Sequence, residues 1–291
     1  MDTFLYASST TAEEKYSGKK QIVSLGAGSD TRYFRLKQKH PDLDLIYHEL
    51  DFSSNTKAKI ALLSSSAFVD AAKRLCGIDL RSADVQVTED GARLSSPGYQ
   101  IYPQDLRDLP RDVATLPGVD ATTATLLISE CCLIYLSPEQ ADRVLEYFTK
   151  LFSTNVPLAM AIYEPIRPND AFGRTMVSNL TARGIHLQTL EKYASLSAQR
   201  ARLRKYGFNH LPEEADSSTV SSGSDAADID FVWKKWVSLD LNEKERVEGL
   251  EWLDEVEEFT LFARHYCVAW GWRAFPRGQR WTGSLPRQAD A

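Results

Sequence analysis

Short apolar stretches alternate along this chain with segments whose apolar residues have helical spacing. Residues 21–25 and 124–129 are continuous apolar runs, typical of parallel strands buried on both faces. Further strands are predicted at residues 44–52, 98–103, 158–163 and 266–272. Helices are predicted at residues 55–63, 68–75, 172–183, 197–206 and 243–264. This alternation indicates an α/β fold.

A glycine turn follows the first predicted strand. Gly26, Ala27 and Gly28 come directly after residues 21–25, and residues 29–31 are all good helix N-caps. Two glycines around one small residue let the backbone turn sharply and approach a ligand closely. Because N–H groups at such a helix start face the ligand crevice of an α/β sheet, we expect Gly26, Ala27 and Gly28 to contact a ligand.

The end of the second strand indicates the type of ligand. A dinucleotide fingerprint requires a third glycine three residues after Gly28, where Thr31 stands, so NAD and FAD are disfavoured. Glu49 and Asp51 lie at the end of residues 44–52, where a carboxylate accepts hydrogen bonds from both hydroxyls of a ribose. Asp51 is the predicted ribose ligand. A solvated strand-end acid is the alternative, and it suits Glu49 better.

Two more strands end in candidate ligand residues. Asp105 and Leu106 follow residues 98–103, and such an acid pairs with an exocyclic amine while the leucine packs on a purine. Glu130 follows residues 124–129, at the end of a central strand where ligands bind. Because a buried, unpaired carboxylate is costly, Glu130 should have a partner or a function.

The remaining pattern predicts one domain over residues 1–291. Ser137, Pro138 and Gln140 form a capping box that begins a helix with a purely structural apolar stripe. Residues 1–20 read as a short N-terminal extension without the apolar core of a secretory signal. A Ser-, Asp- and Ala-rich flexible loop is expected at 216–228, and a disordered tail at 275–291.

Composition narrows the classes of function. Among 291 residues, 43% are hydrophobic and 25% charged, which are ordinary globular values. The net charge of −6 argues against nucleic-acid binding, and no apolar run reaches transmembrane length. The five histidines have no metal-ligand spacing, so no metal site is expected. Cys76, Cys131, Cys132 and Cys267 form no C-x-x-C pair, which favours a reducing, cytoplasmic location.

Several motifs together resemble the leucine carboxyl methyltransferase family, whose members methylate the C-terminal leucine of protein phosphatase 2A. The motifs run in order from about residue 21 to 270: LGAGSDTRYFRL, ELDF, DLRDL, LLISECCLIYLSPEQ, YEPIRPNDAFG and LEWLDEVEEF…RHYCVAW. The resemblance implies a class I methyltransferase fold, with a mainly parallel seven-stranded sheet and helices on both faces. It also implies S-adenosylmethionine as cofactor, with S-adenosylhomocysteine as product.

The resemblance carries cofactor roles onto residues already chosen by their chemistry. Gly26 matches the family's glycine loop, and Asp51 resembles its ribose-binding acid. Asp105 and Leu106 resemble the pair that holds the adenine. Glu130 resembles the acid that lines the cofactor pocket at the end of the fourth strand.

The implied reaction makes modest demands on the protein. A leucine α-carboxylate has a pKa of about 3.5, so it is ionised at neutral pH and needs no general base. It needs positioning, desolvation and a donor for its second oxygen. Arg107 is the candidate donor, with Tyr135 as a second. For Arg107, the alternative is an ion pair with Asp108 or another surface acid.

One departure from the family concerns the residues before the first strand. Family members carry a longer segment there, which covers the site and supplies basic residues to the methionine carboxylate of the cofactor. Lys15, Lys19 and Lys20 do not match that segment. We therefore expect the chain to keep the nucleoside half of the site, to bind S-adenosylmethionine weakly and to turn over slowly. Otherwise Lys19, Lys20 or Arg32 meets the carboxylate.

Three other functions stay open. The chain could be a non-catalytic module that binds phosphatase or cofactor. It could be a relative of the tRNA wybutosine carboxyl methyltransferases, although these carry a propeller and act on RNA. A nicotinamide dehydrogenase is disfavoured by Thr31. The expected partner is the C-terminal tail of the protein phosphatase 2A catalytic subunit, bound by a monomer without nucleic acid or membrane.

Overall fold

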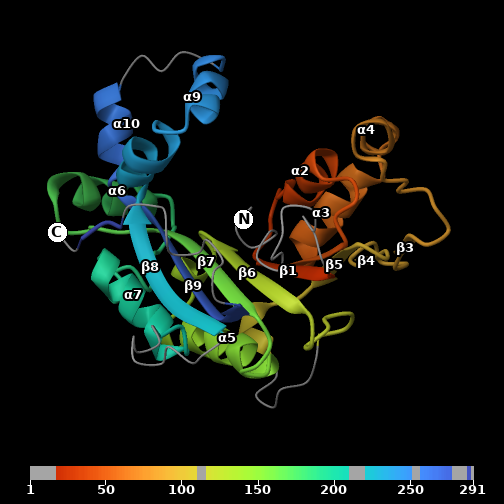
Figure 1. The fold of residues 1–291 in the computed structure, drawn as a ribbon, viewed down its shortest axis with the longest axis horizontal. Helices are drawn as coiled ribbons and strands as arrows, with labels where there is room; N and C mark the ends of the chain where they lie inside the picture. The colour runs from red at the N-terminus through yellow and green to blue at the C-terminus, as the bar shows by residue number, and fades with distance from the viewer. Residues whose placement is uncertain (1–17, 110–115, 210–219, 251–255, 277–286, 290–291) are drawn as a thin grey trace. The chain divides into compact units, whose positions relative to one another are not determined.

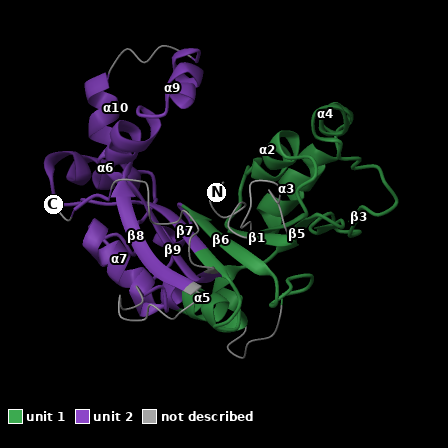
Figure 2. Ribbon diagram, in the orientation of Figure 1, with its two compact units in different colours: residues 1–130, 143–159 green, residues 131–142, 160–291 purple. Residues whose placement is uncertain are grey.

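The computed structural model describes residues 18–109, 116–209, 220–250, 256–276 and 287–289 (Figure 1). The chain divides into two compact units (Figure 2). The first comprises residues 1–130 and 143–159, and the second comprises residues 131–142 and 160–291. Strands and helices alternate in both, which confirms the α/β prediction.

The first unit is built on a mainly parallel sheet. Its strands follow the order β3-β4-β5-β2-β1-β6, and β3 and β4 form a short antiparallel edge. The strands are β1 (Lys20–Leu25), β2 (Leu45–Asp51), β3 (Gln86–Val87), β4 (Leu94–Ser95), β5 (Tyr99–Pro103) and β6 (Ala124–Glu130). All six residues of β1 are buried, as expected for a central parallel strand.

The register of this sheet places the candidate residues together. Leu25 pairs with Leu50 on one side and with Ser129 on the other, so β1, β2 and β6 end at one edge. Gly26, Asp51 and Glu130 are the residues that follow or end these strands. Their convergence is therefore a consequence of parallel pairing between segments far apart in sequence.

Helices flank the strands of the first unit. They are α2 (Arg32–Lys39), α3 (Ser53–Leu63), α4 (Ser66–Cys76) and, in its larger part, α5 (Pro138–Leu151). Tyr33 of α2 stacks on Tyr99 of β5, with 4.5 Å between ring centroids. At the start of α5, Gln140 N–H donates to Ser137 Oγ (3.2 Å) and Ser137 N–H donates to Gln140 Oε1 (2.9 Å), which confirms the capping box.

The second unit contains the last three strands of the sheet. Strand β7 (Leu158–Pro165) has its first two residues in the first unit and the rest in the second, where β9 (Tyr266–Pro276) and β8 (Val220–Asp228) follow in order. Strands β8 and β9 are antiparallel. The helices are α6 (Ala171–Ala182), α7 (Leu196–Lys205), α8 (Ile229–Val232), α9 (Leu241–Glu248) and α10 (Val256–Ala263).

Three sequence predictions need correction. Among the described residues the sheet has nine strands rather than seven, because the two-residue strands β3 and β4 extend its edge. The flexible loop expected at 216–228 is wrong for Val220–Asp228, which forms strand β8, while 216–219 lie outside the described residues. The helix expected at 243–264 is described as two helices, α9 and α10, with 251–255 outside the described residues.

The disordered tail expected at 275–291 is wrong for part of its length. Phe275 and Pro276 belong to β9, and Gln288 Nε2 donates to Asp228 Oδ2 at 2.8 Å. Residues 277–286 and 290–291 lie outside the described part of the chain, as do residues 1–17 of the expected extension. Whether the whole chain is one methyltransferase domain stays a prediction.

A fully buried ion pair anchors α7 to β7 in the second unit. Arg202 Nη1 lies 2.9 Å from Glu164 Oε2, and both side chains have 0% exposure. The Arg202 guanidinium also covers the ring of Tyr193 at 4.1 Å. A buried charge without its partner is strongly destabilising, so this contact constrains how α7 packs.

Replacing Arg202 with methionine should therefore lower the free energy of unfolding by about 3–5 kcal/mol, because Glu164 keeps its burial and loses its cation. Urea denaturation measures the loss. The matched control is Lys150→Met, which removes an exposed cation paired with Glu146 and should cost less than about 1 kcal/mol. Equal losses in the two variants would show that Glu164 does not depend on Arg202.

Candidate active site

The glycine turn has the backbone geometry that its sequence predicts. Gly26 has φ 62° and Gly28 has φ 50°, a region that other residues adopt at a cost. The N–H groups of Gly26 and Ala27 both donate to Leu50 O, at 2.8 and 3.2 Å. A side chain at Gly28 would meet nothing within 4 Å, so the space beside this residue is open. The turn can therefore receive a ligand.

Asp51 links the glycine turn to the end of β2. Its Oδ2 accepts from Gly28 N–H at 2.7 Å, and its Oδ1 accepts from Phe52 N–H (2.7 Å) and Asn55 Nδ2 (2.8 Å). A carboxylate offers about four acceptor positions. Three are used within the protein, which leaves about one, on Oδ2, for a ligand hydroxyl.

Asp105 follows β5 by two residues and caps the 3-10 turn Leu106–Asp108, and the preceding Gln104 N–H donates to Asp51 O at 2.8 Å. Arg107 donates to the Asp105 carboxylate from its backbone N–H at 2.9 Å and from Nη2 at 2.5 Å. These hydrogen bonds hold the pKa of Asp105 below its usual range. Arg107 thus pairs with a surface acid, but with Asp105 rather than Asp108. Leu106, between Asp105 and Arg107 in sequence, is buried.

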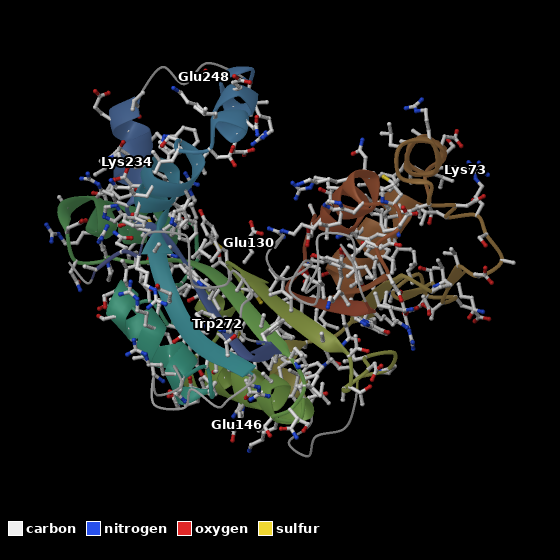
Figure 3. All side chains as sticks on the ribbon, viewed as in Figure 1. Lys73, Glu130, Glu146, Lys234, Glu248 and Trp272 are labelled. Atoms are coloured by element: carbon white, nitrogen blue, oxygen red, sulfur yellow. The ribbon has the colours of Figure 1, made fainter. Side chains whose placement is uncertain are left out.

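Glu130, which is labelled in Figure 3, ends β6, and it has the partner that the sequence argument required. Its side chain is 49% exposed and forms an ion pair with Arg32. The expected burial is wrong: Glu130 is the last residue of β6 and the one exposed residue of that strand. Arg32 also pairs with Asp30, with 3.1 Å between Nη1 and Oδ2.

Asp30 is a buried acid that sequence reasoning used only as a helix cap. Its side chain is 3% exposed, and Oδ2 accepts from Tyr47 Oη at 2.6 Å and from Ser24 Oγ at 3.4 Å. Burial, followed by the charge of Asp30, raises the pKa of Tyr47 well above its usual range. The sequence feature that could have indicated this role is the motif Asp30-Thr31-Arg32. In it, Arg32 N–H donates to Asp30 Oδ1 at 2.8 Å.

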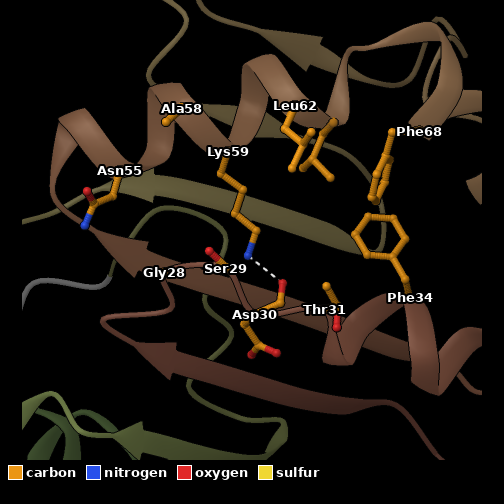
Figure 4. A pocket seen from close by; sticks show the side chains of 11 residues that line it. Gly28, Ser29, Asp30, Thr31, Phe34, Asn55, Ala58, Lys59, Leu62 and Phe68 are labelled. Atoms are coloured by element: carbon orange, nitrogen blue, oxygen red, sulfur yellow. Dashed lines mark hydrogen bonds between the residues drawn. The ribbon is translucent and has the colours of Figure 1, made fainter.

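Lys59 holds the turn from the side of α3 (Figure 4). Its Nζ donates to Asp30 O at 2.7 Å and forms an ion pair with Glu49. Glu49 also accepts from Tyr99 Oη at 2.8 Å. Glu49 is buried, so its interpretation as a solvated acid is wrong. Burial, opposed by Lys59, raises the pKa of Glu49 to about 7.

A cavity of about 420 Å³ opens between the turn and the helices of the first unit (Figure 4). Its walls are mostly apolar, with Asp30 and Lys59 as the charged groups. The lining residues are Gly28, Ser29, Asp30, Thr31, Phe34, Asn55, Ala58, Lys59, Leu62, Leu63 and Phe68. The second-strand acid Asp51 lines a smaller hollow with Ala27, Gly28 and Asn55.

Tyr135 belongs to the second unit. It ends the 3-10 turn Leu133–Tyr135, with its side chain 45% exposed, and its backbone carbonyl accepts from Gln188 Nε2 at 2.5 Å. Partial burial raises the pKa of its phenol. The roles of Tyr135 and Arg107 at a substrate carboxylate stay predictions.

The described residues contain neither a metal-binding cluster nor a membrane-spanning helix. No group of three or more His, Cys, Asp or Glu side chains there is placed to hold a metal ion. None of the described helices has the length and apolar character required to cross a bilayer.

The strand order β5-β2-β1-β6-β7-β9-β8, with an antiparallel final pair and a glycine turn after the central strand, defines a class I methyltransferase fold. The family model for leucine carboxyl methyltransferase matches residues 4–149. Leucine carboxyl methyltransferase 1 of Schizosaccharomyces pombe is 36% identical over 88% of this chain and 73% of its own length. The chain therefore belongs to the leucine carboxyl methyltransferase family.

Two further relatives are more similar in sequence. Leucine carboxyl methyltransferase 1 of Aspergillus fumigatus is 51% identical over 87% of this chain, and that of Emericella nidulans is 51% identical over 88%. The chain spans 65% of the length of each of these two relatives.

The raised pKa of Glu49 predicts a pH dependence of stability. Its folded-state value of about 7 exceeds the ordinary value of 4.5, so folding disfavours the charged form. The contribution of Glu49 is therefore fully present below pH 4.5 and is lost as the pH rises through 7. Glu49→Gln should remove this loss.

Urea denaturation between pH 4.5 and 8 measures the effect. The free energy of unfolding of the wild type relative to Glu49→Gln should fall across this range. The exposed Glu146→Gln variant serves as control and should show no such trend. A constant difference between wild type and Glu49→Gln would show that Lys59 keeps Glu49 ionised throughout.

Proposed function

We propose that this protein transfers a methyl group from S-adenosylmethionine to the α-carboxylate of a C-terminal leucine, with the protein phosphatase 2A catalytic subunit as substrate. Membership of the leucine carboxyl methyltransferase family carries the proposal. The convergence of Gly26, Asp51 and Glu130 at one edge of the sheet supports it.

The residues at this edge fit the nucleoside part of the cofactor. The turn at Gly26, Ala27 and Gly28 is open beside Gly28, and Asp51 keeps an acceptor position for a ribose hydroxyl. Leu106 offers a buried apolar surface next to Asp105 for an adenine ring. When bound, the cofactor would supply an electrophilic methyl group, so the substrate carboxylate needs no general base.

Arg107 has two competing roles in this proposal. It occupies the carboxylate of Asp105, which would otherwise receive the exocyclic amine of the adenine. Arg107 is 47% exposed and Asp105 is 22% exposed, so water can take over the hydrogen bonds of Arg107 at little cost when the pair separates. Arg107 would then be released to hold the leucine carboxylate, with Tyr135 as a second donor. Both residues would position the substrate carboxylate, and Arg107 would also neutralise its charge.

The phosphatase substrate, the monomeric state and a cytoplasmic location are parts of the proposal. The family name supports a protein substrate, and the net charge of −6 argues against nucleic acid. None of the four cysteines, all of which lie among the described residues, forms a disulfide, which supports a reducing compartment.

Methyl transfer tests the proposal directly. The chain is incubated with methyl-labelled S-adenosylmethionine and the phosphatase catalytic subunit, with and without its terminal leucine. Label should appear only on the intact subunit, as a base-labile ester. Cofactor binding without transfer would instead indicate a non-catalytic module, and equal labelling of both subunits would exclude the leucine carboxylate as the acceptor.

The ribose contact has its own prediction. Asp51→Ala should weaken S-adenosylhomocysteine by about 1.5–3 kcal/mol, the range for a hydrogen bond to a charged group. Titration calorimetry measures the affinity. Asp44→Ala, which removes an exposed acid just before β2 begins, should leave it unchanged. An analogue without ribose hydroxyls should lose little further affinity in Asp51→Ala. If the variant discriminates against this analogue as strongly as the wild type does, Asp51 does not contact the ribose.

A further inference from the structure

The second unit has a hollow of its own that the proposed function does not use. Its volume is about 540 Å³, which is within the range of small-molecule sites. Its lining comes from the residues after β7, from the end of β8 and the helical turns that follow it, and from the residues before β9. The charged members of the lining are Arg167, Asp228, Asp230, Lys234, Lys235 and Arg264.

The topology places this hollow where α/β sheets bind ligands. Just after β7 ends, Ile166 N–H donates to His265 O at 2.8 Å, and at the end of β8 Asp228 pairs with Cys267. Since β9 begins at Tyr266, β7 and β8 both end beside the start of β9. Ligands bind beyond the carboxyl ends of the strands in such sheets.

The lining of the hollow is positive in an acidic protein. Four of its six charged residues are cations and two are acids, which leaves a net charge of +2, whereas the whole chain carries −6. Although burial raises the pKa of Asp230, hydrogen bonds from Lys234 and Arg264 outweigh this effect and hold the value below its usual range. By charge, the hollow therefore fits a dianion.

The two acids hold three of the cations in place. Arg167 Nη2 lies 3.1 Å from Asp228 Oδ2, and Arg264 Nε lies 3.1 Å from Asp230 Oδ2. Lys234, labelled in Figure 3, donates to Asp230 Oδ2 at 3.0 Å. The side chains of Asp228 and Asp230 are 4% and 10% exposed, so these contacts have buried anchors. The cations are thus oriented before any ligand arrives.

Donors remain for a ligand after these contacts are made. Within the described residues, neither Lys235 nor the terminal nitrogens Nη1 and Nη2 of Arg264 have a hydrogen-bond partner. A guanidinium presents two parallel donors to an oxyanion, and a lysine adds a compact positive charge. A phosphate monoester carries close to two negative charges at neutral pH, whereas a carboxylate carries one. The free donors and the charge therefore both suit a phosphate monoester.

We propose that this hollow binds the phosphate group of a small phosphate monoester, with Arg264 and Lys235 as its direct ligands and Arg167 as a further cation. The proposal goes beyond methyl transfer, because all of these residues belong to the second unit and none has a role at the cofactor or the substrate carboxylate. A phosphorylated protein offers the same group, but the volume of the hollow favours a whole small molecule.

Titration calorimetry of the full chain with phenyl phosphate and phenyl sulfate tests the proposal. The two ligands have the same shape, but the sulfate carries only one negative charge, so phenyl phosphate should bind more tightly. Lys235→Gln and Arg264→Gln should each weaken phenyl phosphate by about 10-fold, the loss of one hydrogen bond to a charged group. Arg264→Lys, which keeps the charge, should retain part of the affinity.

Lys244→Gln is the matched control. It removes an exposed cation of α9 that pairs with Glu248, and it should leave the affinity unchanged. Thermal unfolding of each variant shows whether a loss of binding reflects a loss of fold, and Lys235→Gln should unfold at the temperature of the wild type, because Lys235 has no described partner.

Three results would overturn the proposal. The first is that phenyl phosphate does not bind or binds no better than phenyl sulfate. The second is an unchanged affinity in both Lys235→Gln and Arg264→Gln. The third is that a phosphoserine peptide binds more tightly than phenyl phosphate and with the same dependence on Lys235, which would make the ligand a protein segment. None of these results bears on methyl transfer, which the labelled cofactor tests separately.

Discussion

The buried carboxylate of Asp30 is the contact on which the candidate site depends. It lies inside the turn after β1 and accepts from Tyr47, Ser24 and Arg32 at once. Its own backbone carbonyl receives Lys59 from α3. One residue therefore joins the central strand, the neighbouring strand and two helices at the point where the backbone turns through two left-handed glycines. A charge buried in this way is tolerated only because cations and hydroxyls surround it.

The same constraint explains the rest of the turn's support. Lys59 bridges Asp30 and Glu49, and Glu49 in turn binds Tyr99 on β5. The second unit uses the same type of contact between Glu164 and Arg202. Such pairs add little net stability compared with apolar residues, but removing one partner is costly. They therefore fix one arrangement of strands and helices. A site built from residues that converge from several strands requires such a fixed arrangement.

Local patterns were sufficient to predict the elements that carry the site. The apolar runs at β1 and β6, the glycine turn and Asp51 were readable because each depends on neighbours in sequence. The pairs Arg32–Glu130 and Lys59–Glu49 could not be predicted, because each joins residues from different elements that only the register of the sheet brings together. Strand β8 was missed for a related reason. Its Ser, Gly and Asp residues read as a loop, but Asp225 is buried against Arg200 while Ala226 and Ala227 pack inside. Composition cannot show the partner that makes a polar strand stable.

Two of the three acids assigned to the cofactor are already held by arginines, so ligand affinity is a difference between two sets of contacts. The two arginines are not equivalent. Arg107 grips Asp105 at the surface with no buried anchor, so a ligand can displace it at little cost. Arg32 is fixed to buried Asp30, and moving it would leave that carboxylate short of a cation. If a ligand binds Glu130, it therefore costs less free energy for Arg32 to keep its place and share Glu130 with the ligand than to move away from Asp30. The difference between the two arginines is thus whether a second, buried contact exists. Arg107 lacks one and can change partners, whereas Arg32 has one in Asp30 and stays in place.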